Sequence, residues 1–121
     1  MSVFSNIEKN RKIYQGKHFF LIKDGYPVSL GHILIISNKE KLDYFELDKN
    51  ERNELTELII KGKEIIENEY NPDGYNIGMN CGEFAGQSVM HFHCHIIPRF
   101  KGDMKNPKGG IRHCIEGKGK Y

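Results

Sequence analysis

One short segment of the chain, residues 91–97, alternates histidine with apolar residues and reads His-Phe-His-Cys-His-Ile-Ile. Successive side chains of a β-strand point to opposite faces, so this alternation predicts a strand with one polar face and one apolar face. The two faces would be divided as follows: His91, His93 and His95 on one, Phe92, Cys94 and Ile96 on the other. The apolar face would pack against a core. A strand that gives a whole face to imidazoles is not optimised for burial, which indicates that the histidines serve chemistry.

Four interpretations of the three histidines are open at this point. They could be solvated on a surface strand, or they could form a pH switch. Two of them could chelate zinc, with His32 as a further ligand. In the fourth interpretation, a neutral imidazole attacks phosphorus and forms a phospho-histidine intermediate. The regularity of the pattern argues against a merely solvated strand, and no second feature of the sequence supports a switch.

The residues immediately before the histidines favour attack on phosphorus. The run Gly86-Gln87-Ser88 would place flexible backbone, an amide and a hydroxyl at the mouth of the histidine face, and all of these can donate to phosphate oxygens. Metal sites usually also have carboxylates close to their ligands, and this run has none. Asn80, on a preceding predicted strand, would lie beside the histidines if the two strands pair as a hairpin.

The rest of the chain predicts β-strands around one long helix. Residues 48–70 form the helix, because Asp48 and Glu51 are spaced as a capping box and apolar residues recur at three- and four-residue intervals. Strands are expected at residues 12–15, 18–23, 32–36, 75–80 and 88–98, and a short helix at about residues 2–10. Short links between strands favour antiparallel pairing, so we expect an α+β fold.

Composition restricts this fold to one small domain. The 121 residues include 18 basic and 16 acidic side chains, and a net charge of +2 gives no electrostatic signal for nucleic acid. No apolar run is long enough for a membrane helix, and the first residues have no stretch typical of a signal peptide. Three widely spaced cysteines (Cys81, Cys94 and Cys114) suggest neither a disulfide scaffold nor a structural zinc site. We therefore expect a single cytoplasmic domain, residues 1–121, that binds neither membrane nor nucleic acid.

Taken together, these motifs resemble the histidine triad (HIT) superfamily of nucleotide hydrolases and transferases over about residues 3–101. The resemblance rests on the complete triad, on the GQSV run before it, on Asp24 followed eight residues later by His32, and on Asn80 eight residues before Ser88. It implies a five-stranded antiparallel sheet with one long helix and a short N-terminal helix. It also implies that two chains join their sheets in a homodimer.

The resemblance further implies a role for each site residue. His93 would attack the α-phosphorus and hold the nucleotide as a nucleotidyl-histidine until water releases it. His95 and Ser88 would donate to phosphate oxygens or to the leaving group, and His32 and His91 would orient them. The nucleotide would be bound by Asp24 through the ribose hydroxyls, Ile22 at the base, and Asn80, Gly86, Gln87, Ser88 and His95 around the phosphate.

On sequence alone, three of these residues also have structural interpretations. Asp24 could simply form its Asp-Gly turn, Asn80 could close a strand, and His32 could be a buried histidine. Their joint spacing favours the site. His18 and His113 are expected at the surface.

The expected reaction is hydrolysis of a dinucleoside polyphosphate, because Pro98-Arg99 follows the triad as it often does in that branch of the superfamily. The alternatives are a purine nucleoside phosphoramidase of the same fold, a zinc-dependent enzyme and a non-catalytic nucleotide-binding module. The superfamily favours a purine, adenosine in particular. We expect no cofactor, with Mg²⁺ serving only as the counter-ion of the substrate. We also expect no bound metal, because the chain lacks the N-terminal C-x-x-C through which some members bind zinc.

Overall fold

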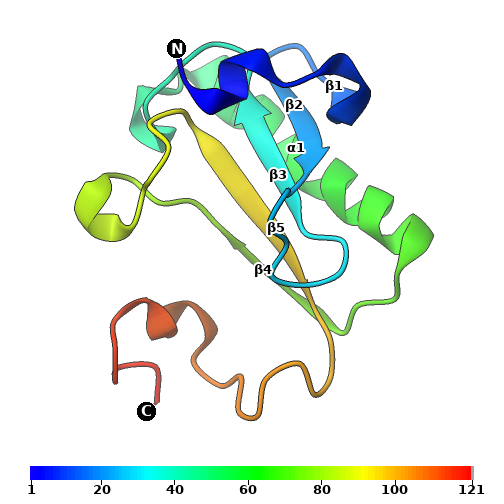
Figure 1. The fold of residues 1–121 in the computed structure, drawn as a ribbon, viewed down its shortest axis with the longest axis vertical. Helices are drawn as coiled ribbons and strands as arrows, with labels where there is room; N and C mark the ends of the chain where they lie inside the picture. The colour runs from blue at the N-terminus through cyan, green and yellow to red at the C-terminus, as the bar shows by residue number, and fades with distance from the viewer. Residues whose placement is uncertain (121) are drawn as a thin grey trace.

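The protein forms one antiparallel sheet of five strands with one long helix, seen in a computed structural model that describes residues 1–120 (Figure 1). The order of the strands across the sheet is β1-β2-β3-β5-β4. Their bounds are Lys12–Gln15 for β1, Phe19–Lys23 for β2, Ile33–Ser37 for β3, Gly74–Gly78 for β4 and His93–Arg99 for β5. The predicted α+β fold class is confirmed. Among the described residues, no helix is long and apolar enough to cross a membrane.

The long helix α1, Lys49–Glu69, covers one face of the sheet and begins as the sequence predicts. The Asp48 side chain accepts from the Glu51 backbone N–H, and the Glu51 side chain accepts from the Asp48 backbone N–H, which completes a capping box. The helix lies so close to β5 that a β-carbon on Gly62 would collide with the Ile96 side chain. Glycine therefore allows the close packing of helix and sheet.

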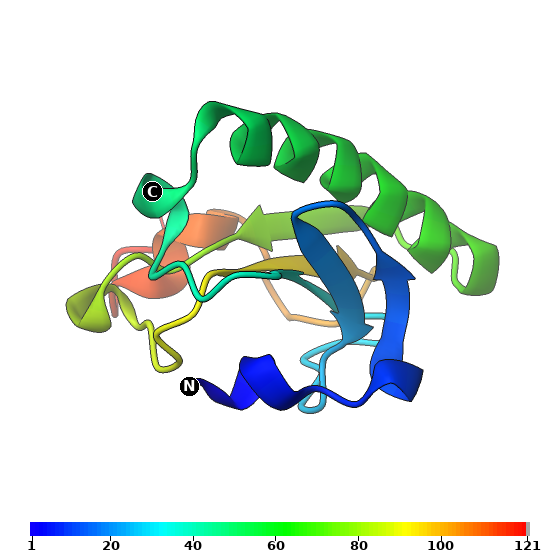
Figure 2. The same ribbon diagram turned by 90° about the horizontal axis from the view of Figure 1, so that it is seen from above.

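The opposite face of the sheet is covered by the N-terminal segment, which lies across the sheet from α1 (Figure 2). Phe4 and Ile7 pack there against a smaller core cluster formed by alternate residues of β2 and β3: Phe20, Ile22, Leu34 and Ile36. The expected helix over residues 2–10 is instead two short 3₁₀ turns, η1 (Val3–Asn6) and η2 (Lys9–Arg11). So short a segment is marginal as an α-helix, and the more extended 3₁₀ turns reach further across the sheet.

Strand β5 lies inside the sheet, between β3 and β4, but it begins later than predicted. The strand expected from Ser88 starts at His93, because β3 ends at Ser37, whose backbone N–H donates to the Phe92 carbonyl, and leaves residues 88–91 without a strand partner. His91 and Phe92 lead into β5, and the Phe92 backbone N–H donates to the Lys41 carbonyl. The predicted division of faces still holds: Phe92, Cys94 and Ile96 are buried in the core under α1.

The chain after β5 continues beside β4 on the side of the sheet away from α1. It contains a further 3₁₀ turn, η5 (Gly110–Cys114), and the loop between β4 and β5 contains another, η4 (Glu83–Ala85). A β-carbon on Gly78 of β4 would lie 3.8 Å from Ile111 of η5, which places this turn next to the strand.

Candidate active site

A cavity of about 820 Å³ opens on the face of the sheet away from α1, under the N-terminal segment. Six of the residues predicted for the site line it: Ile22, Asp24, His32, Ser88, His93 and His95. They come from β2, the turn before β3, the run before β5 and β5 itself. The antiparallel register brings Ile22 and His95 together, because Ile22 of β2 pairs with Leu34 of β3, which in turn pairs with His95 of β5.

The hydrogen bonding of His93 suits a nucleophile. Its Nδ1–H donates to the backbone carbonyl of His91 at 2.8 Å, since a carbonyl can only accept. In the neutral ring, Nε2 is therefore without a proton and has its lone pair free. The edge of the Phe4 ring packs against this imidazole, with 5.0 Å between ring centroids, and restrains its plane.

His32 and His95 form a chain of hydrogen bonds that fixes the tautomer of each ring. The Val28 backbone N–H donates to His32 Nδ1 at 3.2 Å, so the proton of the neutral His32 ring is on Nε2. That Nε2 lies 2.9 Å from His95 Nδ1, which accepts. The remaining nitrogen of His95, Nε2, then carries a proton and is a donor on the cavity.

The electrostatics agree with neutral rings. Burial lowers the pKa of His95 to about 4, with the neighbouring His32 and His93 adding to the effect and Asp24 opposing it. Burial also lowers the pKa of His32, again against the nearby Asp24 carboxylate. Both imidazoles are therefore uncharged at neutral pH, as the hydrogen-bonded chain requires.

Asp24, His32 and His95 also bring their polar atoms within 4.8 Å of one another, an arrangement that could hold a metal ion. The hydrogen bonds argue against that use. A metal on His32 Nε2 would move the ring proton to Nδ1, where it would face the Val28 N–H. His91, a ligand in the zinc alternative, has both ring nitrogens occupied by other partners. Asp24, His32 and His95 therefore fit a chain of hydrogen bonds with fixed proton positions better than they fit a metal centre.

His91 is buried, with 1% of its surface exposed, and its ring is held by hydrogen bonds on both nitrogens. Its Nε2–H donates to the Ser37 carbonyl at 2.7 Å. Its Nδ1 accepts from the Ser2 hydroxyl at 2.6 Å, which ties the start of the chain to the triad. The His91 carbonyl in turn holds His93, so the hydrogen bonds of His91 position the neighbouring histidine of the strand rather than His95 or Ser88.

Asp24 forms the turn considered from the sequence, and its second carboxylate oxygen faces the histidines of the cavity. Its Oδ1 accepts from the Tyr26 backbone N–H at 2.8 Å, as a turn-forming residue does. Its Oδ2 lies 3.3 Å from His32 Nε2 and 3.9 Å from His95 Nδ1, at the wall of the cavity. Ile22, two residues earlier, is buried and gives the same cavity an apolar floor.

The other predicted phosphate-binding residues lie elsewhere. Asn80 and Gly86 line a second cavity, which meets the first at Val28, His32 and His95. The Gln87 side chain is buried and lines neither of the two. It accepts from the Gly82 N–H and donates to the Leu42 and Val89 carbonyls, so it shapes the loop before β5. The three residues therefore split between a second cavity and loop support.

Several cavity residues were missed by sequence reasoning. Phe4, Ile7, Arg11 and Tyr26 all line the first cavity. The three-residue spacing of Phe4 and Ile7 was a signal that one side of their segment is apolar. Nothing in the sequence, however, says which surface that side covers. The group that donates to His32 Nδ1 is the backbone N–H of Val28. Every residue type except proline has such a group, so the sequence gives no indication of this contact.

Comparison with known proteins agrees with this architecture. The HIT domain family profile matches residues 6–102. An uncharacterized HIT-like protein of Methanocaldococcus jannaschii is 37% identical over 100 residues, which cover 81% of this chain and 75% of that protein. The AP-4-A phosphorylase of Mycobacterium tuberculosis is 31% identical over 97 residues, or 79% of this chain and 50% of the relative. The chain thus matches only half the length of this second relative.

Solved structures show the same fold. A HIT family protein from Bacillus anthracis superposes with a TM-score of 0.71 at 37% identity, covering 76% of this chain and 65% of that one. A zinc-bound histidine triad family protein from Mycobacterium smegmatis gives 0.70 at 28% identity, over 78% and 69% of the two chains. The family profile, the relatives and the arrangement of the three histidines lead to one conclusion: this chain belongs to the HIT domain family.

Proposed function

We propose that the protein hydrolyses nucleotidyl conjugates at the α-phosphorus through a covalent intermediate on His93. The observation that carries the proposal is the hydrogen bond from His93 Nδ1–H to the His91 carbonyl. It leaves Nε2 as a free nucleophile on a cavity into which His95 presents an N–H donor. A neutral imidazole held in one tautomer is what attack on phosphorus needs.

In the proposed first step, His93 Nε2 forms a bond to phosphorus while the bond from phosphorus to the leaving group breaks. In the second step, water attacks phosphorus, the N–P bond breaks, and the nucleoside monophosphate leaves. His95 Nε2–H would stabilise the phosphate oxygens; removing one such donor typically costs about 3–4 kcal/mol of transition-state stabilisation. Ser88, which lines the cavity, would give its hydroxyl proton to the leaving atom in the first step and regain a proton from the attacking water in the second.

The nucleoside would lie in the first cavity, between the sheet and the N-terminal segment. Asp24 would accept from the ribose hydroxyls, and the base would pack against the apolar side chains of Ile22, Leu34 and Phe4. The preference for a purine, adenosine in particular, rests on the family alone.

Two substrate classes follow from different observations. Dinucleoside polyphosphates are suggested by relatives named AP-4-A phosphorylase and, in Schizosaccharomyces pombe, bis(5'-nucleosyl)-tetraphosphatase. The Pro98-Arg99 motif adds no support, because Arg99 is hydrogen-bonded to Asp103 and Asn76 and lines neither cavity beside the histidines. Nucleoside phosphoramidates are favoured by the second cavity, which no lysine or arginine lines.

The experiment is to incubate the purified protein with a dinucleoside polyphosphate and with a nucleoside phosphoramidate, and to separate the products. Acid-labile nucleotidyl adducts on His93, detected by mass spectrometry after rapid quenching, would support the covalent route. Nucleotide binding without turnover of either substrate would instead support the non-catalytic module. Exhaustive chelation is the control for metal: activity lost on chelation and restored by zinc would support the zinc-dependent alternative.

We also propose that the protein is a cytoplasmic homodimer. Strand β4 is at the edge of the sheet, and Ile77 in its middle remains 42% exposed. An apolar edge strand gains from pairing with a second copy. Light scattering at micromolar concentration should then give twice the mass of one chain, and a fully active monomer would remove the dimer from the proposal.

A further inference from the structure

The first cavity extends across the sheet from the histidines of β5 to the segment just before β1. The register gives its direction: His95 pairs with Leu34, Leu34 pairs with Ile22, and Ile22 pairs with Lys12, the first residue of β1. Neighbouring strands are about 4.8 Å apart, so β1 lies roughly 14 Å from β5. Arg11, immediately before Lys12, lines the cavity at this far end. A nucleoside whose phosphate lies at the histidines therefore extends toward Arg11.

Arg11 ends the turn η2, which lies beside the loop that follows β2 (Figure 2). Its Nη2 lies 3.7 Å from the point that a β-carbon on Gly25 would occupy. Because Gly25 has no side chain, the space above this part of the loop is open to the guanidinium. Arg11 is thus placed next to the neighbour of Asp24, the residue that we assign to the ribose hydroxyls.

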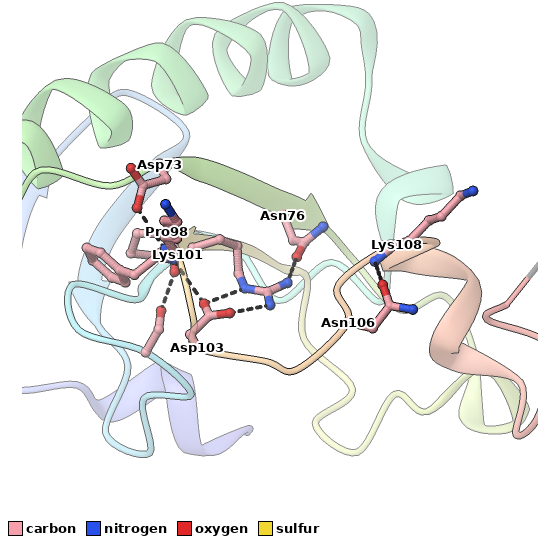
Figure 3. Close-up of polar contacts among 10 residues, drawn as sticks. Asp73, Asn76, Pro98, Lys101, Asp103, Asn106 and Lys108 are labelled. Atoms are coloured by element: carbon pink, nitrogen blue, oxygen red, sulfur yellow. Dashed lines mark hydrogen bonds and ion pairs between the residues drawn. The ribbon is translucent and has the colours of Figure 1, made fainter.

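The guanidinium of Arg11 keeps its N–H donors available. No hydrogen bond or ion pair joins this side chain to another residue within the described part of the chain. Arg99 shows the opposite case, because its guanidinium donates to the Asp103 carboxylate at 2.7 and 2.8 Å and to Asn76 Oδ1 at 2.7 Å (Figure 3). Arg99 therefore serves the structure, whereas the donors of Arg11 can serve a ligand in the cavity.

The charges around the cavity restrict what these donors can meet. Among the described residues that line it, Arg11 is the one lysine or arginine and Asp24 is the one carboxylate. A further phosphate on the ribose would face the Asp24 carboxylate, which would repel it. Arg11 is therefore suited to an uncharged part of the nucleoside, and the base, packed on Ile22, is the part that extends toward it.

The chemistry of arginine selects among the bases. A guanidinium has only donors, held in a planar fork, so its best uncharged partner is a pair of adjacent acceptors. Guanine presents such a pair in O6 and N7, which arginine recognises with two parallel hydrogen bonds in DNA. On the same edge adenine presents N7 beside an amino group, and that amino group is a donor that would oppose an arginine N–H.

We propose that Arg11 recognises the base and that the first cavity prefers a 6-oxopurine, guanine or hypoxanthine, to adenine. The proposal rests on the proposed function, because it uses the placement of the nucleoside given there. It replaces the adenosine preference of the family with one that follows from a residue of this chain. Arg11 contacts the base and not the reacting phosphorus, so it determines specificity and takes no part in the chemical step.

The test measures the affinity of the full-length protein for four nucleoside monophosphates by isothermal titration calorimetry. The monophosphates of guanosine and inosine share the O6 and N7 acceptors and should both bind about tenfold or more tightly than that of adenosine. The monophosphate of 7-deazaguanosine keeps O6 but has a carbon in place of N7, so it should lose most of this advantage. The kcat/KM values for guanosine and adenosine conjugates should follow the same order.

Three variants locate the preference. Arg11→Gln should lower the affinity for guanosine monophosphate to that for adenosine monophosphate and leave the latter within about twofold. Arg11→Lys keeps the charge without the planar fork, so it should also lose most of the preference. Lys9→Gln is the matched control, because it removes a cation from the same turn η2 at a position that does not line the cavity. It should change none of the four affinities by more than about twofold.

Equal affinities for the guanosine and adenosine monophosphates would overturn the proposal. It would also be wrong if the inosine compound bound like the adenosine one, since the 2-amino group of guanine would then be recognised instead. An equal loss for all four nucleotides with Arg11→Gln would make Arg11 a general cation for phosphate, against the proposal. A guanine preference in binding without turnover of any conjugate would overturn the proposed hydrolysis and leave the role of Arg11 standing, whereas absence of all nucleotide binding would overturn both.

Discussion

The side chains on the two faces of β5 are held in place by different interactions. On one face, Phe92, Cys94 and Ile96 are at most 1% exposed and pack under α1 by shape alone. On the other face, His93 and His95 stay partly open to a cavity and are held by hydrogen bonds. One strand therefore carries stability on one side and chemistry on the other. Substitutions on the two faces should affect different properties of the protein.

The histidine face avoids the usual cost of burying polar groups. His91 and His32 are both at most 2% exposed, yet each ring nitrogen has a partner. Among the described residues, no buried side-chain nitrogen or oxygen lacks a hydrogen bond. A fully satisfied polar network of this kind is rigid, because each ring has one allowed tautomer. The polar face is thus ordered without depending on apolar packing.

The largest expected effect is the loss of turnover in His93→Ala. Removing the nucleophile should lower kcat by at least about 10³-fold, as for other enzymes with covalent intermediates, while the free energy of unfolding changes little. Steady-state kinetics and urea unfolding of the same preparation measure both properties. His113→Ala, which lies outside the site, is the control and should keep full activity. Retention of more than about a tenth of the activity would remove His93 from the role of nucleophile.

The matching change on the apolar face is Ile96→Ala. This side chain is fully buried and fills the contact with Gly62 of α1, so its truncation should cost about 2–5 kcal/mol in the free energy of unfolding. The kcat of the protein that remains folded should stay within a few-fold. Urea unfolding with Ile60→Ala as the surface control tests the first part. A fall in kcat as deep as that of His93→Ala would show that the two faces are not independent.

The sequence predicted the apolar face of β5 better than the polar one. Alternation alone placed Phe92, Cys94 and Ile96 in the core, and the Asp48–Glu51 spacing identified the start of α1. These features are local, so local patterns reveal them.

The details of the histidine face depend on partners that are distant along the chain. The Ser2–His91 bond spans 89 residues, and the bond from Val28 to His32 comes from a backbone group. Residue types alone reveal neither contact. The same limit explains Gln87: its residue type suits phosphate binding, but the loop uses its amide for support.

The stability of the histidine face should also depend on pH through His95. Its folded pKa is about 4 against an ordinary value of 6.5, so between these values the unfolded chain binds more protons. The free energy of unfolding should therefore fall as pH drops below 6.5, by about 2 kcal/mol at pH 5 from this group. His32, whose pKa is lowered by burial, changes stability in the same direction. Urea unfolding at pH 7.5 and 5.0 should show a smaller loss for His95→Gln than for the unmodified protein. Identical losses would contradict a neutral His95 in the folded protein.

The smallest expected effect is that of a substitution at Ser2, which should change both stability and catalytic rate. Its hydroxyl donates to His91 Nδ1 at 2.6 Å, and its oxygen also caps η1 by accepting from the Phe4 N–H. Ser2→Ala should therefore cost about 1 kcal/mol in the free energy of unfolding, the scale of one cap or hydrogen bond. It should also lower kcat by a few-fold, because a freer His91 holds the carbonyl partner of His93 less firmly. Ser2→Thr keeps the hydroxyl and should restore both properties together. If Ser2→Ala lowers stability without changing kcat, the N-terminal segment only covers the site, and the separation between the two faces of β5 is complete.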